Sequence, residues 1–265
     1  SGQDIDKERQ NADLLMARMI QRLLKETKGQ LVSFNGGTKD NAIPRECEAS
    51  LIYESDEEAA KAEELACELA ETYAEELTPA EPDFSCEISC ETNRTAEAIP
   101  QDAAKEFICA MRLAPNGIQK RNIKMDGFVV VSLNLGVVRT EEDRIVMIFS
   151  PRSSVASLQE DTKERLNTLA ETFGFTVSHS SEYPGWSFKE DSPVREICKE
   201  SYKELFGEDL KIEAIHAGLE CGLFSDAIKG LDAIAIGPTI ANCHTPDEYL
   251  TLDSFERFYE FLKDI

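Results

Sequence analysis

The order of helical and strand patterns along the 265 residues constrains the fold more than any other feature of the sequence. Apolar residues at helical spacing are followed by stretches that alternate or are rich in strand formers. A capping box of Ser55 and Glu58 marks the start of a second helix. The first stretch therefore predicts a helix, two strands, a helix and a strand at residues 6–27, 31–34, 48–53, 55–77 and 84–90.

A comparable order then recurs. Pro100 opens a helix to about residue 113, and Ser157 with Glu160 caps another helix later in the chain. The strands expected around these helices lie at residues 128–138, 145–149 and 175–178. Two units of the same order predict an α+β domain at residues 1–182, in which a duplicated antiparallel sheet is covered by helices.

The pattern changes after Tyr183. Ser192 and Pro193 form an N-cap and a first helical position, and that helix ends at Gly207. A strand, a short helix, a strand and a terminal helix are then expected at residues 210–215, 219–228, 232–236 and 252–262. The continuously apolar residues 233–236 are typical of a strand buried on both faces of a parallel sheet. Because so short a piece cannot cover both faces, residues 183–265 are predicted to be an incomplete α/β segment.

Composition excludes several classes of function. The 51 acidic and 28 basic residues give a net charge of −23, which repels nucleic acid and anionic membranes. The sequence shows no apolar run of membrane-spanning length and no export signal. Eight cysteines without a CxxC pair indicate reduced thiols. We therefore expect a soluble cytoplasmic protein without a nucleic-acid or membrane partner.

Two segments carry residues suited to chemistry. His244 follows the predicted strand 232–236, at a position where α/β sheets collect ligand sites, and it has a cysteine and two carboxylates nearby. It is either a metal ligand or a structural loop histidine. Gly218 and Gly222 allow a close backbone approach, and the helix that starts between them can hold an anionic group such as a substrate carboxylate. The alternative for that segment is a glycine-rich turn with a buried cysteine.

Several strings resemble the aminoacyl-histidine dipeptidases, which belong with the carnosinases and the co-catalytic zinc aminopeptidases. They are HAGLECGLF (216–224), IGPTI (236–240), CHTPDEYL (243–250), PNGI (115–118) and SLNLG (132–136). The opening SGQDIDKERQNA is similar to the start of the family's lid, and the resemblance runs essentially from end to end. It implies a lid and dimerisation domain at residues 1–182 and the last part of the catalytic domain at residues 183–265.

The resemblance also implies a reaction. Such enzymes use two divalent metals, usually zinc, to activate a water that hydrolyses Xaa-His and other dipeptides, with a glutamate as general base. Most of their metal ligands precede the lid, including an H-x-D pair, and no H-x-D occurs in this sequence. Of the metal ligands, the chain keeps only His244, and the family's lid histidine would come just before Ser1. We therefore expect an inactive fragment with no catalytic residue of its own.

Substrate contacts are carried over in the same way. Glu220 and His216 match the region where relatives anchor the terminal groups of the substrate, and Asn134 and Arg152 match lid positions that reach the dipeptide. A guanidinium can hold a carboxylate through two hydrogen bonds, although Arg152 could also be an exposed charge at a strand end. A homodimer through the lid is implied. The alternatives are a complete, non-catalytic binding or dimerisation module, and another amidohydrolytic specificity on the same scaffold.

Overall fold

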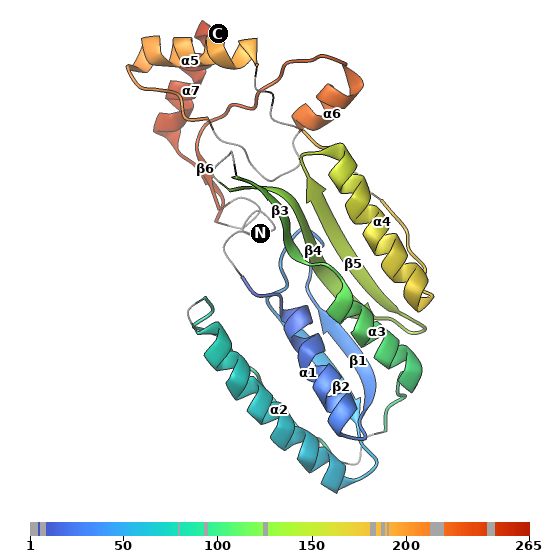
Figure 1. Ribbon diagram of the computed structural model, residues 1–265. Helices are drawn as coiled ribbons and strands as arrows, with labels where there is room; N and C mark the ends of the chain where they lie inside the picture. The colour runs from blue at the N-terminus through green and yellow to red at the C-terminus, as the bar shows by residue number, and fades with distance from the viewer. Residues whose placement is uncertain are drawn as a thin grey trace. The chain divides into compact units, whose positions relative to one another are not determined.

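The computed structural model describes residues 5, 9–78, 80–92, 95–123, 127–180, 184–186, 189, 191–212, 220–242 and 247–265. The chain divides into two compact units, residues 1–180 and 181–265 (Figure 1). The helices of unit 1 are α1 (Ala12–Glu26), α2 (Asp56–Leu77), α3 (Gln101–Leu113) and α4 (Ala156–Phe173). Its strands are β1 (Gln30–Gly36), β2 (Cys47–Ile52), β3 (Gly117–Asn122), β4 (Phe128–Thr140) and β5 (Ile145–Ser153).

The five strands form one sheet in which every pairing is antiparallel. The long strand β4 is its centre. One edge of β4 pairs with β5, and the other edge is shared by β3, which pairs with residues 128–133, and by β1, where Gly36 lies opposite Val138. Strand β2 continues the sheet beyond β1. Thr140 strengthens the short β1–β4 contact, because its hydroxyl accepts from the Phe34 N–H at 2.8 Å.

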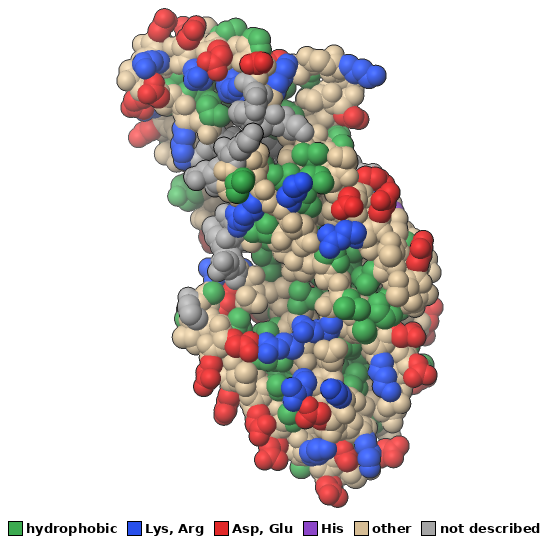
Figure 2. Space-filling view, in the orientation of Figure 1, with side chains coloured by type: hydrophobic (Ala, Val, Ile, Leu, Met, Phe, Trp, Pro, Cys, Tyr) green, Lys and Arg blue, Asp and Glu red, His purple; other side chains and the backbone are tan. Residues whose placement is uncertain are grey.

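Helices α1, α3 and α4 lie side by side on one face of the sheet, and α2 packs beside α1 (Figure 1). The core between them holds Ile20 and Leu23 of α1, Phe34 of β1 and Phe107 of α3, whose rings meet edge to face at 5.4 Å. Helix α1 begins where the Asn11 side chain accepts from two backbone N–H groups. The acidic side of α2 faces outward and appears as a line of acidic side chains in Figure 2.

Three of the expected strands do not form. Residues 84–90, 175–178 and 232–236 have no strand pairing. Phe84, Cys86 and Ile88 are half-buried against the core, so their alternation reports a segment that packs on the core without joining the sheet. The halves are also not equal copies, because the second half adds β3, a partly polar strand (GIQKRN) that the alternation did not predict. Helix α4 begins without a side-chain cap, so the expected box of Ser157 and Glu160 is wrong.

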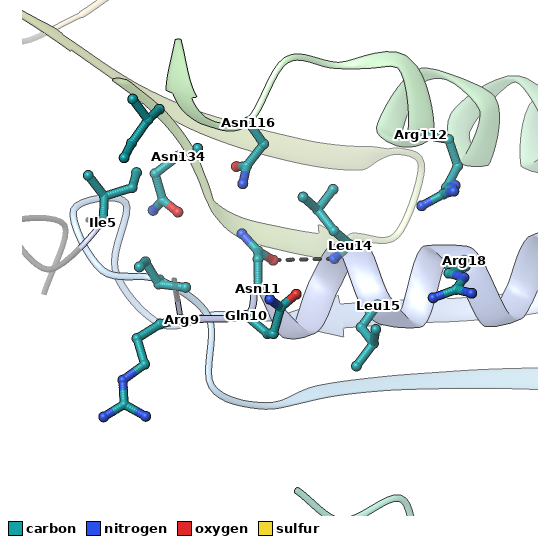
Figure 3. Close-up of a pocket in the computed structure, with 13 residues that line it drawn as sticks. Ile5, Arg9, Gln10, Asn11, Leu14, Leu15, Arg18, Arg112, Asn116 and Asn134 are labelled. Atoms are coloured by element: carbon teal, nitrogen blue, oxygen red, sulfur yellow. Dashed lines mark hydrogen bonds between the residues drawn. The ribbon is translucent and has the colours of Figure 1, made fainter. Parts of the chain in front are cut away.

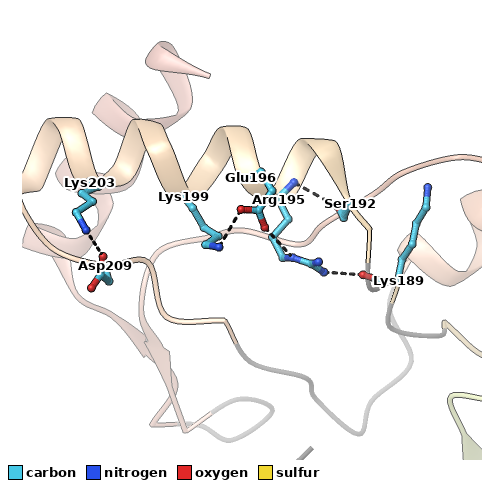
Figure 4. Close-up of polar contacts among 7 residues, drawn as sticks. All are labelled: Lys189, Ser192, Arg195, Glu196, Lys199, Lys203 and Asp209. Atoms are coloured by element: carbon cyan, nitrogen blue, oxygen red, sulfur yellow. Dashed lines mark hydrogen bonds and ion pairs between the residues drawn. The ribbon is translucent and has the colours of Figure 1, made fainter.

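Unit 2 contains α5 (Pro193–Phe206), α6 (Glu220–Ala227), β6 (Ile240–Ala241), β7 (Tyr249–Leu250) and α7 (Leu252–Asp264). Helix α5 is capped by Ser192, ends at Gly207 and carries polar contacts to Lys189 and Asp209 along its length (Figure 4). It packs on α7, where the Tyr202 and Phe261 rings meet edge to face. The only strand pairing in the described part of this unit is the antiparallel β6–β7 hairpin.

The parallel strand expected at residues 232–236 is therefore not observed. A strand needs a neighbouring strand to satisfy its backbone, and the described residues of unit 2 place none beside this segment. Ile236 is 36% exposed, so its apolar side chain is not buried within the unit. Residues 210–212 are irregular, and the rest of the strand expected at 210–215 lies outside the described residues. The α/β prediction for this unit is thus confirmed only as far as a mixed content of helices and strands.

Candidate functional site

The strand register brings two of the predicted site residues together. In the β4–β5 pair, Asn134 lies opposite Ser150, and Ser132 lies opposite Arg152. Asn134 and Arg152 are therefore diagonal neighbours on one face of the sheet. Asn134 is 4% exposed and alternates with the fully buried Leu133 and Leu135. Asn134 and Arg152 lie on the same face of the sheet only because β4 and β5 pair in this register.

The connection between β1 and β2, residues 37–46, covers part of this surface. It is longer than the usual hairpin loop of about two to five residues, and it is closed at its ends by a bond from the Gly37 N–H to the Glu46 carbonyl. It lies directly on β4, because a methyl group at Gly136 would overlap the Asp40 carbonyl. A further bond, from Ala12 N–H to the Pro44 carbonyl at 3.1 Å, ties the loop to α1. We call these residues the 37–46 loop.

The Asn134 side chain holds this loop in place. Its Nδ2 donates to the carbonyl oxygens of Asp40, at 3.3 Å, and Ala42, at 2.8 Å. Its Oδ1 is buried and has no hydrogen-bond partner among the described residues. Residues 38–41, the tip of the loop, are exposed. A buried amide therefore supports an exposed polar tip.

Arg152 lies beside the same loop. Its side chain is partly buried, and this burial lowers the pKa of the guanidinium, while the charge of Asp40 raises it. An arginine nevertheless stays protonated at any physiological pH. Arg152 consequently places a positive, fork-shaped donor group next to the loop tip, which is the chemistry that binds a carboxylate.

A cavity of about 530 Å³ is lined by Asn134 and by Ile43 of the 37–46 loop (Figure 3). Its lining includes Asn11, Asn116 and Asn134, each from a different one of the sequence strings that resemble the family. Leu135 sits between the parts of β4 that pair with β3 and with β1. Its carbonyl accepts from Asn11 Nδ2 at 2.7 Å, and its N–H donates to Asn116 Oδ1 at 2.9 Å. Asn11 and Asn116 thus satisfy the backbone carbonyl and N–H of Leu135 at the centre of the sheet.

The cavity is rimmed by arginines. Arg9 is paired with Glu81, and Arg18 forms two hydrogen bonds with Glu76. Arg112 also lines the cavity and makes no hydrogen bond or ion pair with any residue that the structure describes. Glutamates outside the cavity lining thus balance the positive charges of Arg9 and Arg18.

In unit 2 the predicted residues are only partly described. Glu220 is exposed at the start of α6, and His216 lies outside the described residues. A methyl group on Gly222 would lie 2.8 Å from the Pro184 carbonyl oxygen, so this glycine allows a close contact with the protein's own backbone. The Cys221 thiol is half-buried, 3.8 Å from the Ile234 carbonyl. Gly222 itself lies in the first turn of α6, and Gly218 lies outside the described residues.

His244 also lies outside the described residues, but its flanking segments are defined. On either side of it, Ile240 and Ala241 of β6 pair antiparallel with Leu250 and Tyr249 of β7. Asn242 adopts a positive φ of 55° and donates to the Asp247 carbonyl at 3.3 Å. Among the described residues, no group of three or more His, Cys, Asp or Glu side chains is placed to hold a metal ion. These residues by themselves do not fit a metal centre.

The 37–46 loop is the part of this region that sequence reasoning missed. The Gly36-Gly37 and Asn41-to-Pro44 signals in the sequence mark it only as a turn-rich connection. Its length between two adjacent antiparallel strands is the signal that could have identified it.

Known proteins match the chain as follows. The model of peptidase family M20/M25/M40 matches residues 37–265. The cytosol non-specific dipeptidase of Escherichia coli strain K12 is 32% identical over 269 residues, which cover 100% of this chain and 54% of that protein. The crystal structure of aminoacylhistidine dipeptidase from Vibrio alginolyticus matches with 32% identity and a TM-score of 0.84, over 98% of this chain and 53% of that one. The chain thus spans about half the length of these relatives. In the described residues, no helix is long and apolar enough to cross a membrane.

Proposed function

Because the chain belongs to peptidase family M20/M25/M40, we propose that it is the second half of a cytoplasmic, metal-dependent dipeptidase acting on Xaa-His and other dipeptides. The observation that carries this proposal is the match of nearly the whole chain, at a TM-score of 0.84, to one half of an aminoacylhistidine dipeptidase. The Escherichia coli relative is a cytosolic dipeptidase by name. Family membership does not favour the alternative of a non-catalytic binding or dimerisation module.

In this proposal unit 1 is the lid, and unit 2 is the C-terminal part of the catalytic domain. The antiparallel sheet with helices on one face supports the first assignment. The exposed apolar surface of unit 2 supports the second. On α7, the apolar side chains of Leu252, Phe255, Tyr259 and Leu262 are between 47% and 73% exposed, which suits a helix that packs on further protein. A homodimer through the lid belongs to the same proposal.

The proposed substrate is a dipeptide held between charged groups. Arg152 would hold a carboxylate beside the tip of the 37–46 loop, and Asn134 serves the same surface. Glu220 and His216 are proposed to contact the substrate's terminal groups from unit 2. Two divalent metals, proposed as zinc, would activate the attacking water, with His244 as one ligand. Since the sequence contains no H-x-D pair, we propose that the chain alone is inactive.

A hydrolysis assay on the purified chain tests this proposal. The chain, loaded with zinc, should bind the metal weakly and hydrolyse no dipeptide, because a competent zinc site needs about three protein ligands. Metal content is determined on the same sample. Tight stoichiometric zinc with chelator-sensitive turnover would mean that the chain is an enzyme by itself. Adding an upstream half with the H-x-D and paired-glutamate motifs should give dipeptide hydrolysis. A folded, metal-loaded complex that hydrolyses no dipeptide would refute the dipeptidase proposal.

A further inference from the structure

The 37–46 loop is fixed far more firmly than a connection between two adjacent strands requires. Its ends are closed by the Gly37-to-Glu46 hydrogen bond, and its inner turn by a bond from the Ala42 N–H to the Lys39 carbonyl at 3.2 Å. Its floor is the backbone of Gly136, where any side chain would overlap Asp40. Yet residues 38–41, which all these contacts support, are exposed. An exposed tip on a rigid base is the arrangement in which loops contribute to binding.

The contact that holds this tip is made by one side chain. Asn134 is 4% exposed, and its single Nδ2 group donates to the carbonyls on both sides of residue 41. Both partners are acceptors, so this end of the amide must be the nitrogen. Being 96% covered, Asn134 offers almost no surface of its own to a dipeptide. Its influence on a ligand must therefore pass through the loop.

The loop lies on β4 at Gly136, and β4 pairs with the strand that carries Arg152. The Asp40 charge acts on the guanidinium, and Asn134 bonds the backbone of the same Asp40. Register places Asn134 and Arg152 as diagonal neighbours on β4 and β5. The loop tip, Arg152 and Asn134 therefore form one group of neighbouring residues, in which Asn134 is the buried member that supports the loop.

We propose that Asn134 is a positioning residue, which orders the 37–46 loop and so holds its exposed tip in register with Arg152 as the dipeptide-binding surface of unit 1. This inference rests on the proposed function, since it concerns the same substrate. It differs from a direct contact because the amide acts through the Asp40 and Ala42 carbonyls.

The neighbouring asparagine provides a matched control. Asn134→Asp replaces the donor with a carboxylate oxygen facing two carbonyl oxygens, which should expel the loop. Asn116→Asp introduces the same charge nearby, but its Oδ1 accepts from the Leu135 N–H, a bond that a carboxylate keeps. Gly136→Ala is a second test variant, because its methyl group displaces the loop from below without changing Asn134.

Loop order is measured on the 265-residue chain by hydrogen exchange of the Gly37 and Ala42 amides. Trypsin cleavage after Lys39 and Arg45, both exposed, gives an independent readout. Asn134→Asp and Gly136→Ala should increase exchange and cleavage in the loop by about tenfold or more, the scale of losing a hydrogen bond, while β4 and β5 keep their protection. Asn116→Asp should leave the loop unchanged. An equally protected loop in both test variants would overturn the proposal.

The consequence for substrate is measured after the upstream half has been restored. Both test variants should raise the KM for a dipeptide by about tenfold, with kcat within about threefold, since binding is lost and the chemistry is not. Combining Asn134→Asp with Arg152→Ala should cost less than the two single effects together, because both act on one surface. A loosened loop with unchanged KM, or fully additive effects, would also overturn the proposal. A wild-type protein that hydrolyses no dipeptide would instead refute the proposed function on which it rests.

Discussion

Asp13 should make the stability of unit 1 fall as the pH rises. Its carboxyl group is completely buried under β1, and a methyl group at Gly36 would overlap it. Burial raises the pKa of Asp13 from 3.8 to about 7, and the Cys47 thiol beside it lowers that pKa in part. Neither carboxyl oxygen accepts a hydrogen bond of good geometry from the described residues. Asp13 is therefore more stable in the fold as a neutral acid than as an anion.

The sign and the size of the effect follow from these values. Below about pH 4, Asp13 is protonated in the folded and unfolded chain alike, and the stability is fully present. Between pH 3.8 and about 7, the unfolded chain releases the proton and the folded chain keeps it. The free energy of unfolding then falls by about 1.4 kcal/mol per pH unit, or about 4 kcal/mol in all. Above pH 7 this contribution does not change further.

The variant Asp13→Asn isolates this residue from the other acidic groups, because an amide of the same shape stays neutral at every pH. Urea unfolding at several values between about pH 5 and pH 8 gives the difference in stability between variant and wild type. The variant should gain about 3 kcal/mol on the wild type across that range. Far-UV circular dichroism is the suitable probe, since the single tryptophan, Trp186, lies in unit 2. The exposed Asp83→Asn serves as control and should change stability by less than about 0.5 kcal/mol. A stability difference for Asp13→Asn that is constant with pH would refute the reasoning.

Three further predictions concern other parts of the chain. Residues 1–182 expressed alone should unfold cooperatively and resist proteolysis, because the sheet and its helices lie within unit 1; rapid cleavage throughout would contradict this. Gly36→Ala should lower the free energy of unfolding by about 2 kcal/mol or more, measured by urea denaturation, since its methyl group must displace the buried Asp13. In the complete enzyme, His244→Ala should remove one metal and most turnover, whereas Cys243→Ala should change both much less; unchanged metal content in the His244 variant would exclude it as a ligand.

Local patterns predicted the regular elements of unit 1 well where a pattern has a single structural meaning. Helical spacing and caps identified α2 and α3, and apolar runs identified β1, β2, β4 and β5 to within a few residues. The first helix was expected from residue 6, but α1 begins at Ala12, after the Asn11 cap. Alternation failed at residues 84–90, because it shows only that one face of a segment is buried. It also gave no signal for β3, whose partner β4 supplies the apolar side chains of the pair.

The candidate site was less predictable than the fold, for a different physical reason. Arg152 and Asn134 were selected by resemblance, and only the β4–β5 register places them together. The partners of Asn134 in the loop lie 92 and 94 residues away along the chain. No local pattern encodes a bond of that separation. The residues whose placement would test the metal site, His216 and His244, lie outside the described part of the chain, so their roles stay predictions.

Register ties the proposed binding surface to the folding of unit 1. Side chains alternate along a strand, so a slip of one residue in β4 would turn Asn134 to the opposite face and bring Leu133 or Leu135 under the loop. Leu135 prevents such a slip, because its N–H and carbonyl are bonded by Asn116 and Asn11, from two other segments of the chain. The same side chains line the cavity beside Asn134. Asn11 and Asn116 therefore fix the register of β4. That register sets the positions of the loop and of Arg152, and any contribution of these asparagines to binding follows from it.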